Sequence, residues 1–246
     1  MKRLIYCIFE GPPNRGWQLP PGVDGERVSF LESDGLCAVA SPIDPSADDP
    51  GALVPRLLAY EAVIEKVHQE RAVLPFRYGC VMESETQALE MLGSRCESCK
   101  SALRGLRGCV EMGVRVFVEN ACGPASPARF AANAGRPESG KSYLHSRQRH
   151  YDELDQRVKQ GAEDADRFCH AFVGLFVKCK SEWTASRNGP SGPRMLSLYF
   201  LAHRDRVDDF RHAFEELTRT EPAKMALTGP WPPYNFVEWN PQGERQ

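Results

Sequence analysis

The sequence predicts an α+β protein made of two domains, residues 1–108 and residues 109–246. Short apolar runs of strand length alternate with longer segments whose apolar residues recur at helical spacing. The order of these segments differs before and after residue 108, and each half can pack one layer of helices on one antiparallel sheet. The chain then ends in a rigid segment that is rich in proline and aromatic residues.

The N-terminal domain is expected to begin with three strands. Residues 3–9 form an apolar run with two hydrophobic faces, which is typical of a central strand. The apolar runs 28–31 and 36–40 flank Asp34 and Gly35, and Asp-Gly between such runs is a strong hairpin signal.

A helix, a strand and a second helix follow in this domain. Between 50 and 71 the helical spacing is set by Leu53, Leu57, Tyr60, Ile64 and Val67. The strand 74–82 contains Pro75, so it is expected at an edge or with a bulge. Ser84 and Gln87 form a capping box that starts the next helix. Its apolar stripe is Leu89, Leu92, Cys96, Cys99, Leu103 and Leu106.

The C-terminal domain is expected to have the order β-α-β-β-α-β, which is the ferredoxin-like arrangement. Residues 110–118 alternate strictly between polar and apolar and predict a half-buried strand. After a loop at 121–139, a long helical region carries Phe168, Phe172, Leu175, Phe176 and Cys179 on one side. The remaining predicted elements are a short strand near Trp183, a turn at 188–193, a strand at 195–202, a helix at 207–217 and a strand at 224–227.

Composition and charge exclude several classes of function for this chain. Charged residues make up 26% and apolar residues 41% of the chain, as in soluble globular proteins. The net charge of −2 gives no general attraction to nucleic acid, and no apolar run is long enough to span a membrane. The apolar N-terminus is interrupted by Glu10 and reads as a strand rather than a signal peptide. Nine cysteines without a secretory signal indicate reduced thiols in the cytoplasm.

Cys96 and Cys99 form a CxxC pair, and we expect both to be packed thiols. A redox pair needs the start of a helix, where the macrodipole lowers the thiol pKa, whereas this pair is predicted midway along one. A zinc half-site would need a second CxxC or a nearby histidine pair.

Two other polar clusters are better explained as solvent-exposed surface than as a metal or acid/base site. His145 and His150 lie five residues apart, off one helical face, and the acidic residues near them form i,i+4 pairs with basic ones. A basic cluster could instead dock an acidic protein surface; it comprises Arg129, Arg136, Lys141, Arg147 and Arg149. No phosphate-loop, dinucleotide or nucleophile motif occurs, so we expect no enzyme, metal or cofactor.

Four segments resemble one protein family. The segment Thr228–Val237, TGPWPPYNFV, resembles the C-terminal signature of the gas vesicle GvpF/GvpL family. The opening LIYCI, the segment LPFRYGCV at 74–81 and GKSYL at 140–144 resemble three further segments of the family in the same order. The chain departs from the usual residues at Tyr78, Cys80 and Ser142, and Ser142 removes a charge.

The resemblance implies a non-enzymatic role in forming gas vesicles, which confer buoyancy. It implies an accessory or minor shell protein, in the cytoplasm or the gas vesicle, that binds the small hydrophobic shell protein and other accessory proteins. Packing of the tail on its own domain and contact with a partner are both open. The alternative is a small-molecule or metal-dependent enzyme on a ferredoxin-like scaffold. The motif residues that could bind a partner are Pro75, Arg77, Gly79, Gly140, Tyr143, Leu144, Gly229, Pro230, Trp231, Pro232, Pro233 and Tyr234.

Overall fold

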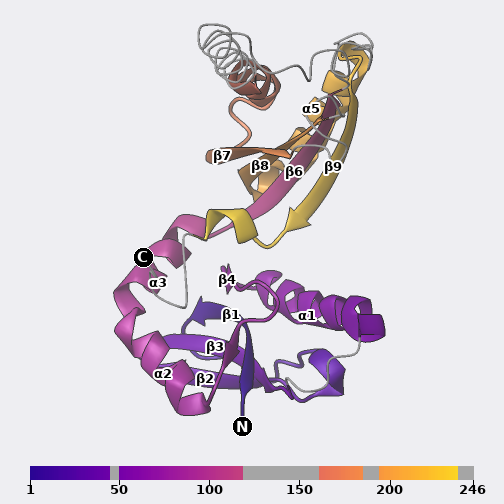
Figure 1. Ribbon diagram of the computed structural model, residues 1–246. Helices are drawn as coiled ribbons and strands as arrows, with labels where there is room; N and C mark the ends of the chain where they lie inside the picture. Colours follow the sequence, from indigo (N-terminus) through magenta and orange to yellow (C-terminus); the bar gives the residue numbers. More distant parts are fainter. Residues whose placement is uncertain (45–49, 119–160, 185–193, 238–246) are drawn as a thin grey trace, which may run out of the picture. The chain divides into compact units, whose positions relative to one another are not determined.

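The computed structural model describes residues 1–44, 50–118, 161–184 and 194–237 (Figure 1). It is a mixed α/β structure with two antiparallel sheets. Contacts divide the chain into two compact units. The first consists of Met1–Met112, Leu201–Asp205 and Gly229–Gln246, and the second of Gly113–Phe200 and Arg206–Thr228.

Strand β1 (Arg3–Glu10) lies inside the first sheet, whose order is β2-β3-β1-β4 with β5 also paired to β1. All six residues from Leu4 to Phe9 are fully buried. The prediction of a central strand covered on both faces is therefore confirmed, because side chains alternate between the two faces and neither face is open to water.

The predicted hairpin is present as β2 (Ser29–Ser33) and β3 (Leu36–Pro42), which pair antiparallel. Asp34 and Gly35 connect them with φ values of 52° and 79°. Positive φ at both central positions matches the twist of the two strands, which explains why Asp-Gly occupies this turn.

Pro75 interrupts the predicted strand 74–82 and leaves two short strands, β4 (Leu74–Pro75) and β5 (Val81–Met82). Both pair antiparallel with β1. Proline lacks the N–H that a continuous ladder needs, and Gly79 between the two strands has a φ of 92°.

Helix α1 (Leu53–His68) covers this sheet with its second half. Tyr60, Ile64 and Val67 are fully buried, as the helical spacing predicts. Leu53, by contrast, is half exposed, although it belongs to the same predicted helical pattern.

The predicted second helix is in fact two helices, α2 (Glu85–Ser94) and α3 (Cys96–Leu106). The capping box is confirmed, since Ser84 Oγ accepts a hydrogen bond from the Gln87 backbone N–H at 3.1 Å. Arg95 has φ −119° and ψ 16°, outside the helical range, and ends the first helix there. Cys96 therefore begins a helix instead of lying midway along one.

The second sheet has the order β7-β8-β6-β9. Its strands are β6 (Cys109–Val118), β7 (Lys178–Thr184), β8 (Arg194–His203) and β9 (Lys224–Trp231). Helix α5 (Val207–Thr220) follows β8, and residues 161–170 are helical as well. Short 3-10 turns occur at Val23–Gly25, Pro50–Ala52, Arg204–Arg206 and Tyr234–Phe236.

Aromatic side chains form the core of the second unit. The Phe172 ring stacks on Phe210 with centroids 4.3 Å apart, and both rings contact Phe200. Aromatic contacts of this kind contribute beyond the area that they bury. Phe172 and Phe200 also show that the segment after residue 170 packs on the sheet.

Two predicted boundaries and one predicted pattern change between β6 and β9. Cys179 lies in β7, because the helix ends in a turn at 171–174 where Gly174 has a φ of 84°. The last strand does not end at residue 227 but continues through Pro230, which is tolerated because β9 is at the edge of the sheet. The strict alternation predicted for 110–118 fails at Glu111, which is buried.

Candidate functional site

The C-terminal motif divides into a buried and an exposed part. Gly229 and Pro230 belong to β9, and Pro232 and Pro233 after it are buried. The Trp231 side chain between them is 47% exposed. The rigid backbone thus holds one large aromatic ring in water instead of burying all of them.

Glu111 on β6 fixes the segment after the prolines. Its carboxylate accepts hydrogen bonds from the Asn235 backbone N–H at 2.8 Å and from the Asn235 side-chain amide at 2.6 Å. Glu111 is only 5% exposed, so these bonds compensate a buried charge. Phe236 next to Asn235 is also buried. The role of Glu111 was not predicted, because its place in an alternating strand indicates a solvent-facing residue.

Tyr234 forms a second anchor, on α1. Its hydroxyl donates to Glu61 Oε2 at 2.9 Å. Burial raises the pKa of the Tyr234 hydroxyl, and the adjacent Glu61 carboxylate raises it further. Burial also raises the pKa of Glu61, while the hydrogen bond from Tyr234 acts in the opposite direction. Tyr234 therefore remains a neutral donor, and its packing holds the segment on the first unit.

The motif around Pro75 contacts the same core as Tyr234. Pro75 is buried in β4, and Tyr78 packs edge-on against Tyr60 with ring centroids 5.4 Å apart. Tyr78 and Tyr234 both pack against the hydrophobic cluster of the first unit. The structure thus brings two motifs that are far apart in the sequence to one core, and it leaves Arg77 and Gly79 exposed beside it.

The other predicted positions are outside the residues that the structure describes. These are Gly140, Tyr143 and Leu144, the His145 and His150 pair, and the basic cluster from Arg129 to Arg149.

The first half of α1 carries apolar side chains that no other described residue covers well. Leu53, Val54 and Leu58 are 50%, 63% and 66% exposed. Val54 and Leu58 are four residues apart and therefore share one helix face, which continues to the exposed Ala62. We call these residues the α1 apolar stripe (Leu53, Val54, Leu58 and Ala62); of them, only Leu53 belongs to the helical pattern predicted from the sequence, although the four-residue spacing of the others is visible there.

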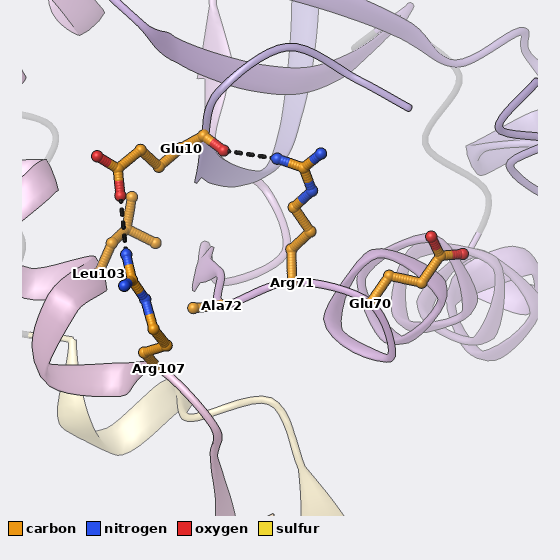
Figure 2. A pocket seen from close by; sticks show the side chains of 6 residues that line it. All are labelled: Glu10, Glu70, Arg71, Ala72, Leu103 and Arg107. Carbon is orange, nitrogen blue, oxygen red and sulfur yellow. Dashed lines mark hydrogen bonds and ion pairs between the residues drawn. The ribbon is translucent and has the colours of Figure 1, made fainter. Parts of the chain in front are cut away.

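A small pocket of about 280 Å³ in the first unit is lined mainly by charged residues (Figure 2). Arg71 donates to the Glu10 carbonyl at 2.9 Å, and Arg107 pairs with the Glu10 carboxylate at 3.5 Å. Glu70, also in the lining, accepts from Asn14 at 3.1 Å and pairs with Lys66. Because these charges already have partners, the pocket links the ends of β1, α1 and α3 and presents no free acid or base.

The CxxC pair lies in the first turn of α3, which begins at Cys96. Cys96 Sγ contacts the Asp34 carbonyl at 3.4 Å. Burial raises the pKa of Cys99, which is 3% exposed, so that thiol stays protonated. Among the described residues, no three histidine, cysteine or acidic side chains are grouped to hold a metal ion. No described helix is both long and apolar enough to cross a bilayer.

Comparison with known proteins relates the chain to gas vesicle proteins. Gas vesicle protein L and gas vesicle protein F of Streptomyces sp. (strain CB03234) are each 28% identical to it. The alignments cover 96% and 87% of this chain and 92% and 89% of those proteins. Gas vesicle protein F1 of Halobacterium salinarum is 26% identical over 92% of this chain and 88% of its own length.

Solved structures show that the fold is shared. GvpF from Anabaena sp. PCC7120 is 19% identical and superposes with a TM-score of 0.70 over 97% of both chains. GvpF from Microcystis aeruginosa is 17% identical, with a TM-score of 0.72 over 96% of this chain and 98% of that one. The model of the family described as gas vesicle synthesis protein GvpL/GvpF matches residues 2–238. This chain therefore belongs to the GvpL/GvpF family of gas vesicle synthesis proteins.

Proposed function

We propose that this chain is an accessory protein of gas vesicle formation that binds the small hydrophobic shell protein, either as a chaperone before polymerisation or as a minor shell component. The exposed α1 apolar stripe carries this proposal. A shell subunit has an apolar gas-facing surface that aggregates in water unless it is covered, and an exposed apolar helix face is suited to cover it.

The binding free energy that covering the α1 apolar stripe would contribute can be bounded. Full burial of a valine or leucine side chain contributes about 1.5–3 kcal/mol. Leu53, Val54 and Leu58 are half to two-thirds exposed, so covering them contributes roughly 1 kcal/mol each. Together they supply a factor of about 100 in affinity, which is too little for stable binding alone. Further contact residues are required.

Trp231 is the best candidate for such a contact in the C-terminal motif. Tryptophan is enriched at interface hot spots, and this ring is exposed while its neighbours Pro232 and Pro233 are buried. We propose that Trp231 contacts the partner and that Tyr234, Gly229 and Pro230 hold it in place.

The remaining motif residues keep their proposed role in partner binding. Among them, Arg77 and Gly79 are exposed. Pro75 is buried and would act by shaping that segment. Gly140, Tyr143 and Leu144 are proposed on the family resemblance. Other accessory proteins of gas vesicle assembly are proposed as further partners, with the gas vesicle and the cytoplasm as the location.

We also infer a ferredoxin-like fold for the C-terminal domain, residues 109–246, beside an N-terminal domain of residues 1–108. The sheet order β7-β8-β6-β9 supports this inference. It equals the order 2-3-1-4 when the four strands are numbered along the chain, as in a split βαβ arrangement.

A pull-down with the small gas vesicle shell protein tests the proposed function. The double variant Val54→Ser/Leu58→Ser and the single variant Trp231→Ala are compared with the full chain. Val173→Ser is the matched control, because Val173 is 64% exposed but lies outside α1 and the tail. Circular dichroism first verifies that each variant is folded.

We expect the full chain and the control to capture the shell protein and the double variant to lose at least tenfold in capture. Equal capture by the double variant would remove the α1 apolar stripe from the proposal. Failure of the full chain to capture the shell protein would contradict direct binding.

A further inference from the structure

Two cysteines of the second unit lie in direct contact. Cys169 is in the helical segment 161–170, Cys179 is in β7, and their sulfur atoms are 3.0 Å apart. A disulfide bond has a sulfur–sulfur distance of about 2.0 Å. The two sulfurs therefore need to approach by only about 1 Å to form a bond.

Both thiols are accessible to a reagent in solution. Cys169 and Cys179 are partly exposed, whereas Cys7, Cys37 and Cys99 are buried. Buried thiols are generally inert because burial disfavours the thiolate and excludes the reagent. Burial raises the pKa of Cys7 and Cys37 accordingly, in the case of Cys37 to about 12.

The contact also makes the two thiols chemically unequal. The hydrogen bond from the Cys179 thiol lowers the pKa of Cys169, against the opposing effects of partial burial and the Asp166 carboxylate. The same contact raises the pKa of Cys179. Cys169 is thus the more acidic thiol of the pair, and Cys179 is the hydrogen-bonded partner that can react in turn.

We propose that Cys169 and Cys179 form a redox-sensitive pair that closes to an intramolecular disulfide when the protein meets a low-molecular-weight disulfide such as oxidised glutathione. This modification site is independent of the shell-protein contact proposed for α1.

The reaction is two successive thiol–disulfide exchanges. The Cys169 thiolate attacks one sulfur of oxidised glutathione, a mixed disulfide forms, and one glutathione thiolate leaves. Cys179 loses its proton and attacks the Cys169 sulfur, the protein disulfide forms, and the second glutathione leaves as a thiolate. The two cysteines lose two electrons, which reduce oxidised glutathione to two glutathione thiolates, and the proton from Cys179 passes to the solvent or to one of these thiolates.

The disulfide would connect the end of the helical segment to β7. At present the connection between them is the chain 170–178, which includes a turn and Gly174 at positive φ. A covalent link across this connection restricts the unfolded chain and so favours the folded arrangement.

The test counts thiols in the full chain after equilibration with oxidised or reduced glutathione. Under denaturing conditions we expect nine reactive thiols after reduction and a loss of two after oxidation. Trypsin cleaves after Arg167, Lys178 and Lys180, so it separates the two cysteines. Without reductant, mass spectrometry should find peptide 168–178 linked to peptide 179–180, and reductant should separate them.

Cys169→Ser and Cys179→Ser should each abolish the loss of two thiols. Cys96→Ser is the matched control, because Cys96 is another partly exposed cysteine, and it should leave that loss unchanged. The proposal is overturned if all nine wild-type thiols remain reactive after oxidation, or if the linked peptides contain a different cysteine pair. The wild-type peptide map decides this even if a variant fails to fold.

Discussion

The two halves of α1 both carry apolar residues at helical spacing, but these residues differ in environment. In the second half, Val63, Ile64 and Val67 are fully buried in the core of the first unit. In the first half, Val54 and Leu58 are about two-thirds exposed. Apolar periodicity therefore identifies a helix but does not tell which apolar residues belong to the core and which remain available to a partner.

The C-terminal segment repeats this contrast over a shorter distance. Tyr234 and Phe236 are packed and anchored, while Trp231 is about half exposed. In both regions a buried part provides rigidity and an exposed part provides contact area. The following experiments test this division, starting with the largest expected effect.

Ile64→Ala should lower the free energy of unfolding by about 2–5 kcal/mol, because it leaves a cavity in a core without exposed atoms. Leu58→Ala is its counterpart in the exposed half and should change stability by less than about 0.5 kcal/mol. Urea titration followed by circular dichroism measures both. Similar losses for the two variants would show that the two halves of α1 are not different.

Acidification should destabilise the first unit through His68, at the end of the buried half of α1. Burial and the nearby Arg204 guanidinium lower the pKa of His68 from 6.5 to about 4. Since the unfolded chain binds the proton more tightly, stability is full above pH 6.5 and falls as the pH decreases towards 4. The loss should reach about 3 kcal/mol.

His68→Leu is the control for this pH dependence. Thermal unfolding of wild type and variant between pH 4 and pH 7 measures it, and the variant should have a shallower acid limb. Parallel curves for the two proteins would contradict a neutral buried imidazole.

Glu111→Ala should destabilise the protein by about 1.5–3 kcal/mol, because the Asn235 backbone and side-chain donors lose a charged acceptor. It should also release the C-terminal segment. Limited proteolysis followed by mass spectrometry would detect earlier cleavage after residue 231 than in wild type. Unchanged protection of the segment would show that the packing of Tyr234 and Phe236 is sufficient.

Trp231→Ala should have the smallest effect on stability, within about 0.5 kcal/mol, since the ring is half exposed. We expect the protein to stay soluble and gas vesicle formation to be lost. Complementation of a deletion strain, scored by buoyancy, measures this. Normal buoyant vesicles would remove Trp231 from the partner surface.

Several elements of the fold could be predicted because local signals determine them. The six-residue apolar run of β1, the Asp34-Gly35 turn and the Ser84 cap all act over a few residues. The break at Arg95 could not be predicted, since the apolar stripe of α2 and α3 continues across it.

The candidate site was less predictable because its interactions are distant in sequence. Glu111 accepts hydrogen bonds from residue 235, and Glu61 accepts one from residue 234. No pattern among the neighbours of either glutamate in the sequence predicts these contacts. The Cys169 and Cys179 contact depends on a turn that the continuous apolar pattern conceals. Conversely, the rigid tail was recognised from proline and aromatic content alone. The domain boundary near residue 108 remains a prediction.

The anchoring of the C-terminal segment has a consequence for synthesis on the ribosome. Tyr234 and Asn235 complete a unit that begins at Met1, and their partners Glu61 and Glu111 are translated long before them. Until residues 234 and 235 leave the exit tunnel, Glu111 lacks its amide donors and part of the core of the first unit remains open. Glu61 and Glu111 are thus made early but reach their final packing only after residues 234 and 235 have been made.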